Sequence, residues 1–310
     1  MKKFILKLIL FSGLIMGSLI LLNSLYVRTQ AYRTMNDMEK FYNVPDNIEI
    51  VNVGSSHGLY AFDWTEGKVN GFNFSLVSQD FYYDLKLLEK FSNRLVEDAI
   101  VIIPISYFSF DTDRKDKERD FQKMNGRYYS LLPPKEIYGF SIQDFLKYRV
   151  LPILSAGEKL KAIISDYTPK NNLTESNNVY EYSQLPEKGR ERAQRHLANI
   201  NKKYFQENMN YLEELIEFAQ YKGFRPILIT TPTTEWYFGN FSDEFLREFS
   251  SLINSIAAYY SIPYFDYSQD PSFRNKPELF LDTDHLNMSG RKVFTSRIID
   301  DLSFYLRPNE

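Results

Sequence analysis

Two short polar motifs, far apart in the sequence, carry residue types that can do nucleophilic chemistry together. Gly54-Ser55-Ser56-His57 ends an apolar run, and Asp282-Thr283-Asp284-His285 lies near the C-terminus. Serine becomes a useful nucleophile when an imidazole takes its proton, and a carboxylate that fixes the imidazole tautomer completes the arrangement. The chain has three histidines, and two of them fall inside these motifs. The pattern indicates a serine nucleophile with a base and an orienting acid.

The elements that must position these motifs follow an alternating pattern. Short apolar, β-rich segments alternate with stretches whose apolar residues recur at helical spacing, which predicts an α/β fold with a parallel sheet covered on both faces. The predicted strands are Ile48 to Val53, Phe72 to Val77, Ala99 to Ile105, Pro226 to Thr230 and Ile262 to Phe265. The predicted helices cover Phe81 to Leu95, Tyr211 to Ala219, Phe245 to Tyr260 and a last stretch from about Gly290.

Both motifs are expected on loops at the carboxyl ends of strands, where open α/β sheets bind ligands. The serine motif directly follows the first predicted strand, and the second motif precedes the last helix. Each also has an interpretation without chemistry. Small polar residues after a strand are common in turns, and Asp284 or Asn287 is suited to cap the last helix.

The N-terminus predicts a membrane anchor. Met1-Lys2-Lys3 precedes an apolar stretch from Phe4 to Val27, which is long enough to span a bilayer and has no cleavage site of small residues. Residues 1–30 are therefore expected to form an uncleaved, single-pass anchor. The lysines favour a cytoplasmic N-terminus, with the main domain at residues 45–306 on the outer side of the cell membrane.

Composition excludes several classes of function. The 310 residues carry a net charge of -3, which argues against a nucleic-acid partner, and the absence of cysteine excludes disulfides and thiolate chemistry. The histidines do not show ligand spacing and the carboxylates are scattered, so no metal site is predicted. No phosphate-binding glycine loop is present, and no cofactor is expected.

A long insertion, at about residues 109–200, separates the third and fourth predicted strands. It begins with the charge-dense Asp111 to Asp120, expected to be solvated, and continues with helical patterns at Gln143 to Ser165 and Glu187 to Ile200 around a polar loop, Pro169 to Gln184. His196 is expected at the surface of a basic helix. A lid or docking surface and a passive surface elaboration are both open interpretations.

The order of these motifs resembles the SGNH (GDSL-like) hydrolase superfamily, in which the serine follows the first strand and Asp-x-x-His precedes the last helix. Gly-Ser-Ser-His resembles its branch of membrane-anchored D-alanyl-lipoteichoic acid biosynthesis and polysaccharide O-acetylation proteins. The resemblance covers about residues 45–306 and implies a three-layer α/β/α sandwich with a mostly parallel five-stranded sheet. It implies Ser56 as nucleophile, His285 as base and Asp282 as its orienting acid, with Asp284 a bystander.

The chain departs from the superfamily at the oxyanion hole. Ser78 stands where the superfamily has a glycine, and Ser106 stands in place of an asparagine. Each lost oxyanion donor costs roughly 100-fold in rate. Asn73 and His57 are further candidates for contacts with the oxyanion or substrate, although His57 is equally suited to be a packed histidine bonded to backbone.

The resemblance implies O-acylation, with acetyl or a similar group, of a cell-envelope polysaccharide or teichoic-acid-like polymer. The acyl group would pass through an acyl-Ser56 intermediate, in series with a multi-pass membrane acyltransferase. Two alternatives remain open. One is a surface carbohydrate esterase, with water as the acceptor; the other is a non-catalytic membrane-tethered scaffold or polymer-binding subunit.

Overall fold

The computed structural model describes residues 1–33, 35–66, 69–110, 125–165, 180–198, 200 and 202–306. The chain divides into two compact units. The first, here called the anchor unit, comprises Met1–Asn43 and Lys117–Thr174; the second, the sheet unit, comprises Val44–Asp116 and Glu175–Glu310. The predicted charge-dense segment at 111–120 and residues 169–179 of the predicted polar loop lie outside the described residues. The predicted domain boundaries stay predictions.

The sheet unit contains the predicted five-stranded parallel sheet. The strands run in the order β2-β1-β3-β4-β5, and every neighbouring pair is parallel. They are β1 (Ile48–Asn52), β2 (Gly71–Asn73), β3 (Leu95–Pro104), β4 (Arg225–Thr230) and β5 (Tyr264–Asp266). The second strand is shorter than predicted, because the chain after Asn73 turns toward the carboxyl end of β1, where Leu76 N–H donates to Gly54 O. The predicted α/β class is confirmed.

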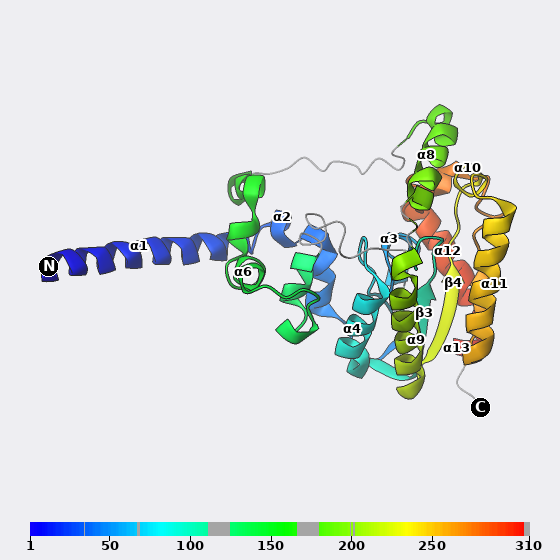
Figure 1. Ribbon diagram of the computed structural model, residues 1–310, viewed down its shortest axis with the longest axis horizontal. Coiled ribbons are helices and arrows are strands. Elements are labelled where there is room, and N and C mark those ends of the chain that lie inside the picture. Colours follow the sequence, from blue (N-terminus) through cyan, green and yellow to red (C-terminus); the bar gives the residue numbers. More distant parts are fainter. Residues whose placement is uncertain are drawn as a thin grey trace. The chain divides into compact units, whose positions relative to one another are not determined.

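Helices cover both faces of this sheet (Figure 1). The main helices of the sheet unit are α4 (Phe81–Phe91), α8 (Leu185–Ala198), α9 (Phe205–Tyr221), α11 (Asp243–Tyr260) and α12 (Met288–Asp301). Shorter helical turns are α3 (Ser56–Leu59), η2 (Trp64–Glu66), η3 (Ser92–Arg94), η9 (Tyr182–Gln184), η10 (Lys202–Tyr204), α10 (Glu235–Phe238), η11 (Pro277–Leu279) and α13 (Ser303–Leu306).

The core forms because strand residues alternate between the two faces of the sheet. Ile100 and Ile102 of β3 point to one face, where Phe294 and Ile298 of α12 pack against them in a fully buried cluster. The connections through α4, α9 and α11 carry the chain in one direction across the sheet, and right-handed crossovers therefore place these helices on the opposite face. This layering leaves the carboxyl ends of the strands free to hold loops.

The anchor unit begins with α1 (Lys2–Tyr26), an exposed apolar helix long enough to cross a membrane. Its other elements are α2 (Gln30–Arg33), η1 (Met35–Asn43), η4 (Gly126–Ser130), η5 (Pro134–Glu136), α6 (Ile142–Phe145), η6 (Leu146–Val150), η7 (Pro152–Ser155), η8 (Gly157–Lys161) and α7 (Ala162–Ser165). The segment expected to be helical, 143–165, is thus a series of short helical turns rather than one continuous helix. Pro152 cannot donate an interior helical hydrogen bond, and Gly157 adopts φ +50°, so the segment forms short turns.

Candidate active site

Ser56 begins α3, directly after the turn that ends β1. Gly54 makes this turn with φ +113°, a backbone conformation that favours glycine. Its N–H donates to Asp84 Oδ1 at 2.7 Å, which fixes the turn from α4. A Cβ on Gly58 would lie 2.3 Å from Ser75 Oγ, so only glycine lets the short helix sit this close to the β2 loop. Ser56 is thereby held at the carboxyl edge of the sheet, half-buried.

A second rigid loop carries the Asp-x-x-His motif. Thr234, after β4, donates both its N–H and its hydroxyl to Thr283 O, at 3.1 and 2.7 Å. Asn287 caps α12 by accepting the N–H of Gly290, and its amide donates to Glu278 O. The capping interpretation thus holds for Asn287. The loop between Thr283 and Asn287 is fastened at both ends.

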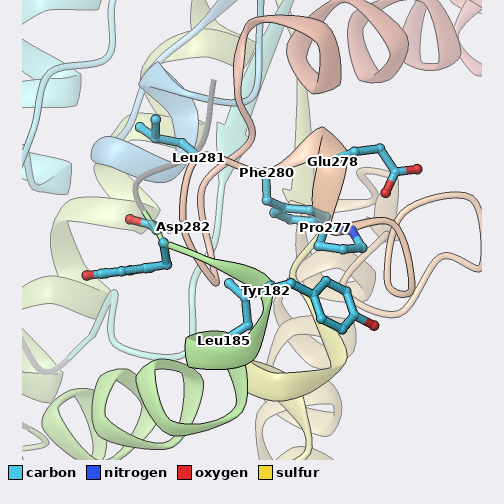
Figure 2. Close-up of a pocket in the computed structure, with 8 residues that line it drawn as sticks. Tyr182, Leu185, Pro277, Glu278, Phe280, Leu281 and Asp282 are labelled. Atoms are coloured by element: carbon cyan, nitrogen blue, oxygen red, sulfur yellow. The ribbon is translucent and has the colours of Figure 1, made fainter. Parts of the chain in front are cut away.

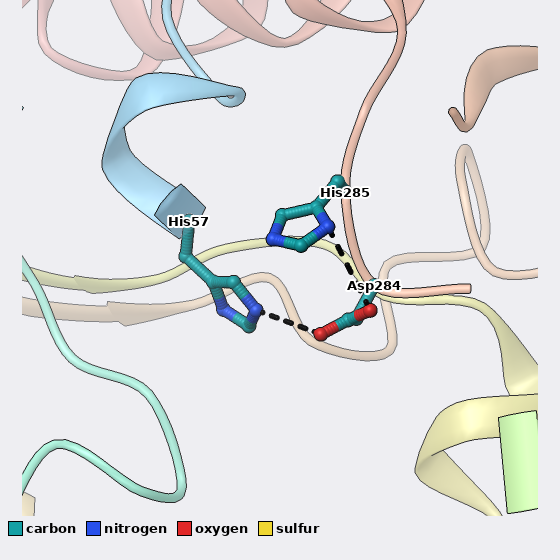
Figure 3. A group of neighbouring side chains, drawn as sticks. All are labelled: His57, Asp284 and His285. Carbon is teal, nitrogen blue, oxygen red and sulfur yellow. Dashed lines mark hydrogen bonds and ion pairs between the residues drawn. The ribbon is translucent and has the colours of Figure 1, made fainter. Parts of the chain in front are cut away.

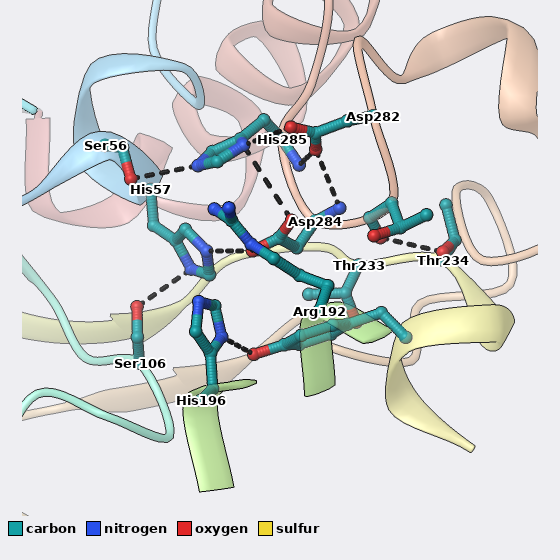
Figure 4. Close-up of polar contacts among 12 residues, drawn as sticks. Ser56, His57, Ser106, Arg192, His196, Thr233, Thr234, Asp282, Asp284 and His285 are labelled. Atoms are coloured by element: carbon teal, nitrogen blue, oxygen red, sulfur yellow. Dashed lines mark hydrogen bonds and ion pairs between the residues drawn. The ribbon is translucent and has the colours of Figure 1, made fainter. Parts of the chain in front are cut away.

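These loops bring Ser56, His285 and Asp282, here called the outer triad, into one hydrogen-bonded chain (Figure 4). Ser56 Oγ lies 2.9 Å from His285 Nε2, and His285 Nδ1 lies 2.8 Å from Asp282 Oδ2. The other carboxylate oxygen of Asp282 accepts the backbone N–H groups of Asp284 and His285. Because a carboxylate only accepts, Nδ1 carries the proton in neutral His285, and Nε2 is free to accept the proton of Ser56.

The charges around His285 strengthen it as a base. Burial by itself lowers the pKa of His285, but the negative charge of Asp284 and the hydrogen bond that His285 donates to Asp282 outweigh it. The pKa of His285 therefore lies above the ordinary value for histidine. A group of this kind takes up a proton readily, as a general base must.

A second chain of the same residue types lies beside the first. Ser106 Oγ is 2.8 Å from His57 Nδ1, and His57 Nε2 is 3.1 Å from Asp284 Oδ2. We call Ser106, His57 and Asp284 the inner triad, because all three are buried. Arg192 Nε donates to the same oxygen of Asp284, at 3.1 Å. Asp284, expected to be a bystander, is thus the point where both histidines and an arginine converge (Figure 4).

In the inner triad the pKa of the histidine is shifted in the opposite direction. Burial lowers the pKa of His57 in spite of its contact with Asp284, so the ring is neutral. Burial would raise the pKa of the Asp284 carboxyl, but the charges and hydrogen bonds of His285, His57 and Arg192 hold it well below its usual range. His57 Nε2–H therefore donates to Asp284, and its Nδ1 accepts the hydroxyl proton of Ser106.

The oxyanion candidates occupy different places. The hydroxyl proton of Ser106 is directed to His57, which leaves it unsuited to an oxyanion. The amide of Asn73 donates to the carbonyls of residues 58, 59 and 62 and so holds α3 in place. Ser78 is exposed with φ +56°, and within the described ranges no hydrogen bond joins it to the outer triad. None of these three side chains contacts Ser56 through a hydrogen bond in the described part of the chain.

Helix α8 contributes residues that sequence reasoning missed or misplaced. His196, expected at the surface, is partly buried: its Nδ1 lies 2.6 Å from the hydroxyl of Tyr237 and its ring packs on Phe108. This burial lowers the pKa of His196 to about 3. The surface prediction is wrong because α8 packs against α10. Arg192 and His196 are four residues apart on one helix face, a spacing that could have indicated a shared contact.

Three potential metal ligands lie together, which sequence spacing did not indicate. Ligand atoms of His57, Asp284 and His285 all fall within 4.8 Å of one another (Figure 3). Each histidine nitrogen already has a hydrogen-bond partner, and Arg192 pairs with the same carboxylate. A cation here would displace these bonds and face a guanidinium, so the donor set fits an ion-pair network better than a metal site.

A cavity of about 280 Å³ borders the outer triad through Asp282 (Figure 2). Its other lining residues include Tyr182 and Leu185 near the start of α8, and Pro277 and Phe280 from the segment before the Asp-x-x-His motif. Tyr182 packs edge-on against Trp236. Trp64 and Tyr237, in contrast, are buried in the core.

No family model and no curated protein matches the chain. Among solved structures, it is similar to the crystal structure of a "putative acylhydrolase" from Bacteroides fragilis, at 12% sequence identity and a TM-score of 0.41. The alignment covers 87% of this chain and 95% of that chain. A likeness at this TM-score carries no argument about function, so the case for the site rests on its own geometry.

Proposed function

We propose that this protein transfers acyl groups through Ser56. The observation that carries the proposal is the continuous chain of hydrogen bonds from Ser56 Oγ through His285 to Asp282, built from two loops 229 residues apart in sequence. The distances and the tautomer suit acyl transfer at serine, and the raised pKa of His285 suits a general base. Ser56 is also partly exposed, unlike Ser106, which is buried.

In the proposed reaction, His285 Nε2 takes the proton of Ser56 as Oγ attacks the carbonyl carbon of an ester or thioester. The tetrahedral intermediate collapses, and His285 returns the proton to the leaving alcohol or thiol. An acceptor hydroxyl then attacks the acyl-Ser56 ester, gives its proton to His285 and leaves with the acyl group as Ser56 Oγ regains a proton. Asp282 holds the imidazole in the required tautomer throughout.

The oxyanion would be bound mainly by backbone N–H groups. The first N–H groups of a helix have no partners within it, and Ser56 occupies this position in α3. Ser78 remains a proposed second backbone donor. With the Ser106 hydroxyl directed to His57, we expect a slower reaction than a complete oxyanion hole supports, by roughly 100-fold for each missing donor.

For the acceptor, we propose a hydroxyl of a cell-envelope polysaccharide or teichoic-acid-like polymer, with a multi-pass membrane acyltransferase as the supplier of acyl groups. This proposal rests on the resemblance of the Gly-Ser-Ser-His motif and on the apolar α1, which is long enough to anchor the protein beside such a partner. Hydrolysis, with water as the acceptor, uses the same first step. A hydroxyl-rich polymer and water therefore compete for one intermediate.

The test is to incubate the full chain in detergent with p-nitrophenyl acetate and map acetyl groups by peptide mass spectrometry. We expect acetyl on Ser56, and its loss in His285→Ala. The Ser106→Ala variant is the matched control and should still be acetylated at Ser56. An unmodified Ser56 in the folded wild-type protein would refute the proposed nucleophile.

A second arm separates transfer from hydrolysis. Acetylated protein is mixed with a soluble oligosaccharide, and products are analysed over time. Acetylated sugar supports a transferase, whereas acetate alone with unchanged sugar supports an esterase.

A further inference from the structure

The anchor unit exposes a concentration of apolar side chains outside α1. Among the described residues beyond that helix, eight exposed large aliphatic side chains are found. Two of them, Met288 and Val293, lie on α12. The other six lie between residues 140 and 164, together with the exposed ring of Phe140: Ile142, Leu146, Val150, Leu154, Leu160 and Ile164. We call residues 140–164 the apolar segment. Such a concentration on one short stretch indicates a contact surface.

The apolar segment is fastened to the end of α1. Tyr26 is fully buried in a cluster with Ile153 and Ala156, and Asn23 Oδ1 accepts the N–H of Ile153 at 3.0 Å. Leu19 packs against the same cluster. These contacts lie within one compact unit, so they fix where the segment sits along the helix.

A membrane-spanning α1 would place these contacts at a bilayer surface. Its 25 residues span about 37 Å, somewhat more than a hydrocarbon core of about 30 Å. Tyr26 therefore lies near one boundary of the membrane, and Leu19, seven residues earlier, lies about 10 Å along the axis toward its centre. Side chains that pack against this stretch are at the depth of the lipid headgroups and the adjoining acyl chains.

The net charge of residues 131–165, which contain the apolar segment, also suits a membrane interface. Residues 131–165 contain five basic side chains and three acidic ones, a net charge of +2 in a chain of net charge -3. The basic residues are Lys135, Lys147, Arg149, Lys159 and Lys161. Exposed apolar residues interspersed with lysine and arginine are typical of segments that lie in a membrane interface and attract anionic lipids.

We propose that the apolar segment lies in the lipid interface beside α1 and gives the anchor unit a second, monotopic contact with the membrane. The occupant of this surface is lipid, not another protein. The inference rests on α1 crossing the membrane, because α1 sets the depth of the segment. Its function is to hold the anchor unit against the bilayer rather than leave it on a free tether.

The natural absence of cysteine allows a direct test on the full chain. Single cysteines replace Ile164, Leu154 and, as a control in the sheet unit, the 85% exposed Tyr221. Each is labelled with a polarity-sensitive fluorophore and reconstituted into vesicles of phosphatidylcholine and phosphatidylglycerol. The Ile164→Cys and Leu154→Cys labels should shift to shorter emission wavelengths, be quenched by doxyl lipid and lose quenching by iodide. The Tyr221→Cys label should behave in the opposite way.

Two outcomes would overturn the inference. Labels at Ile164 and Leu154 that iodide quenches as strongly as the label at Tyr221 would show a surface in water. Labels protected from both iodide and doxyl lipid would show a protein cover. Flotation of the vesicles tests α1 separately: protein that fails to float refutes the anchor and the inference together, whereas protein that floats with water-exposed labels refutes only the inference.

Discussion

The outer and inner triads contain the same three residue types in the same order of contact, yet they differ in exposure and in charge. The outer serine is half-buried and its histidine has a raised pKa, whereas the inner serine is buried and its histidine has a lowered pKa. Arg192 pairs with the inner carboxylate, and Asp282 of the outer triad binds backbone N–H groups instead. Residue identity alone therefore does not set the exposure of the serine or the pKa of the histidine in such a triad.

The two triads are also coupled. Asp284 belongs to the inner triad, but its charge is the largest influence that raises the pKa of His285, whose Nδ1 lies 3.8 Å from Asp284 Oδ1. We infer that the inner triad acts as a fixed, buried charge assembly that supports the base of the outer triad. This division of roles has measurable consequences for single variants.

Replacement of the two serines should give the largest difference in activity between the triads. Ser56→Ala should lower ester hydrolysis by about 10⁴-fold to 10⁶-fold, because the nucleophile is lost. Ser106→Ala removes only a hydrogen bond to His57 and should stay within about 10-fold of wild type. Initial rates with p-nitrophenyl acetate measure both. Equal losses in the two variants would mean that the inner serine shares in catalysis and would contradict the division of roles.

Replacement of the two aspartates should give the second largest difference, in kcat and in the pH dependence of kcat/KM. Asp282→Asn should lower kcat by about 10⁴-fold, because an amide can hold the wrong imidazole tautomer. Asp284→Asn leaves the tautomer of His285 intact but removes the main charge that raises its pKa. The base is active when neutral, so the rising acid limb of kcat/KM should move to lower pH in this variant. An acid limb that stays at the wild-type pH would refute the coupling.

Replacement of Arg192 should shift the acid limb of kcat/KM in the opposite direction. Its positive charge lowers the pKa of His285, so Arg192→Ala should raise that pKa and move the acid limb of kcat/KM to higher pH. Arg195→Ala, on the exposed side of α8, is the matched control and should leave the limb in place. Measured pH profiles that coincide for all three proteins would exclude an electrostatic role for Arg192.

The smallest effect on activity is expected at the turn before Ser56. Burial raises the pKa of Asp84 to about 8, although the hydrogen bonds from Gln79 and Gly54 oppose the shift. Its contribution to stability is complete below about pH 4, the unfolded value, and is lost as pH rises through about 8. Asp84→Asn keeps a neutral group and should remove this loss, which is on the order of a few kcal/mol.

Thermal denaturation of the full chain at several pH values measures this effect. The Asp84→Asn variant should gain stability relative to wild type as pH rises from 4 to 8, with activity near wild type. Asp300→Asn, at an exposed position of α12, is the control and should follow the wild-type curve. Parallel pH curves for Asp84→Asn and wild type would show that Asp84 does not carry the proton.

Local sequence features predicted the strands and the main helices, because a strand or a helix shows itself in the spacing of nearby apolar residues. Apolar runs located all five strands, and the apolar faces of α9, α11 and α12 followed from helical spacing. The failures have physical causes as well. Pro152 and Gly157 interrupt a stretch whose apolar residues otherwise recur at helical spacing, and β2 ends early because its chain bonds to the turn after β1 instead.

The outer triad could be predicted because two of its three residues lie close together in the sequence. Asp282 and His285 are three residues apart, so one loop sets their contact, and the strand order then brings Ser56 to the same edge of the sheet. The inner triad has no such local pair. Its contacts join residues that are 49 and 227 positions apart, and Arg192 reaches Asp284 across 92 positions.

Patterns within a few residues of the sequence encode the α/β class, the apolar N-terminal helix and the candidate residues of the outer triad. The tertiary structure alone decided that Asp284 is central, that His196 is partly buried and that Ser106 binds His57. These outcomes depend on burial and on charges brought together from distant segments, and in a low-dielectric interior such neighbours set pKa values and hydrogen-bond partners.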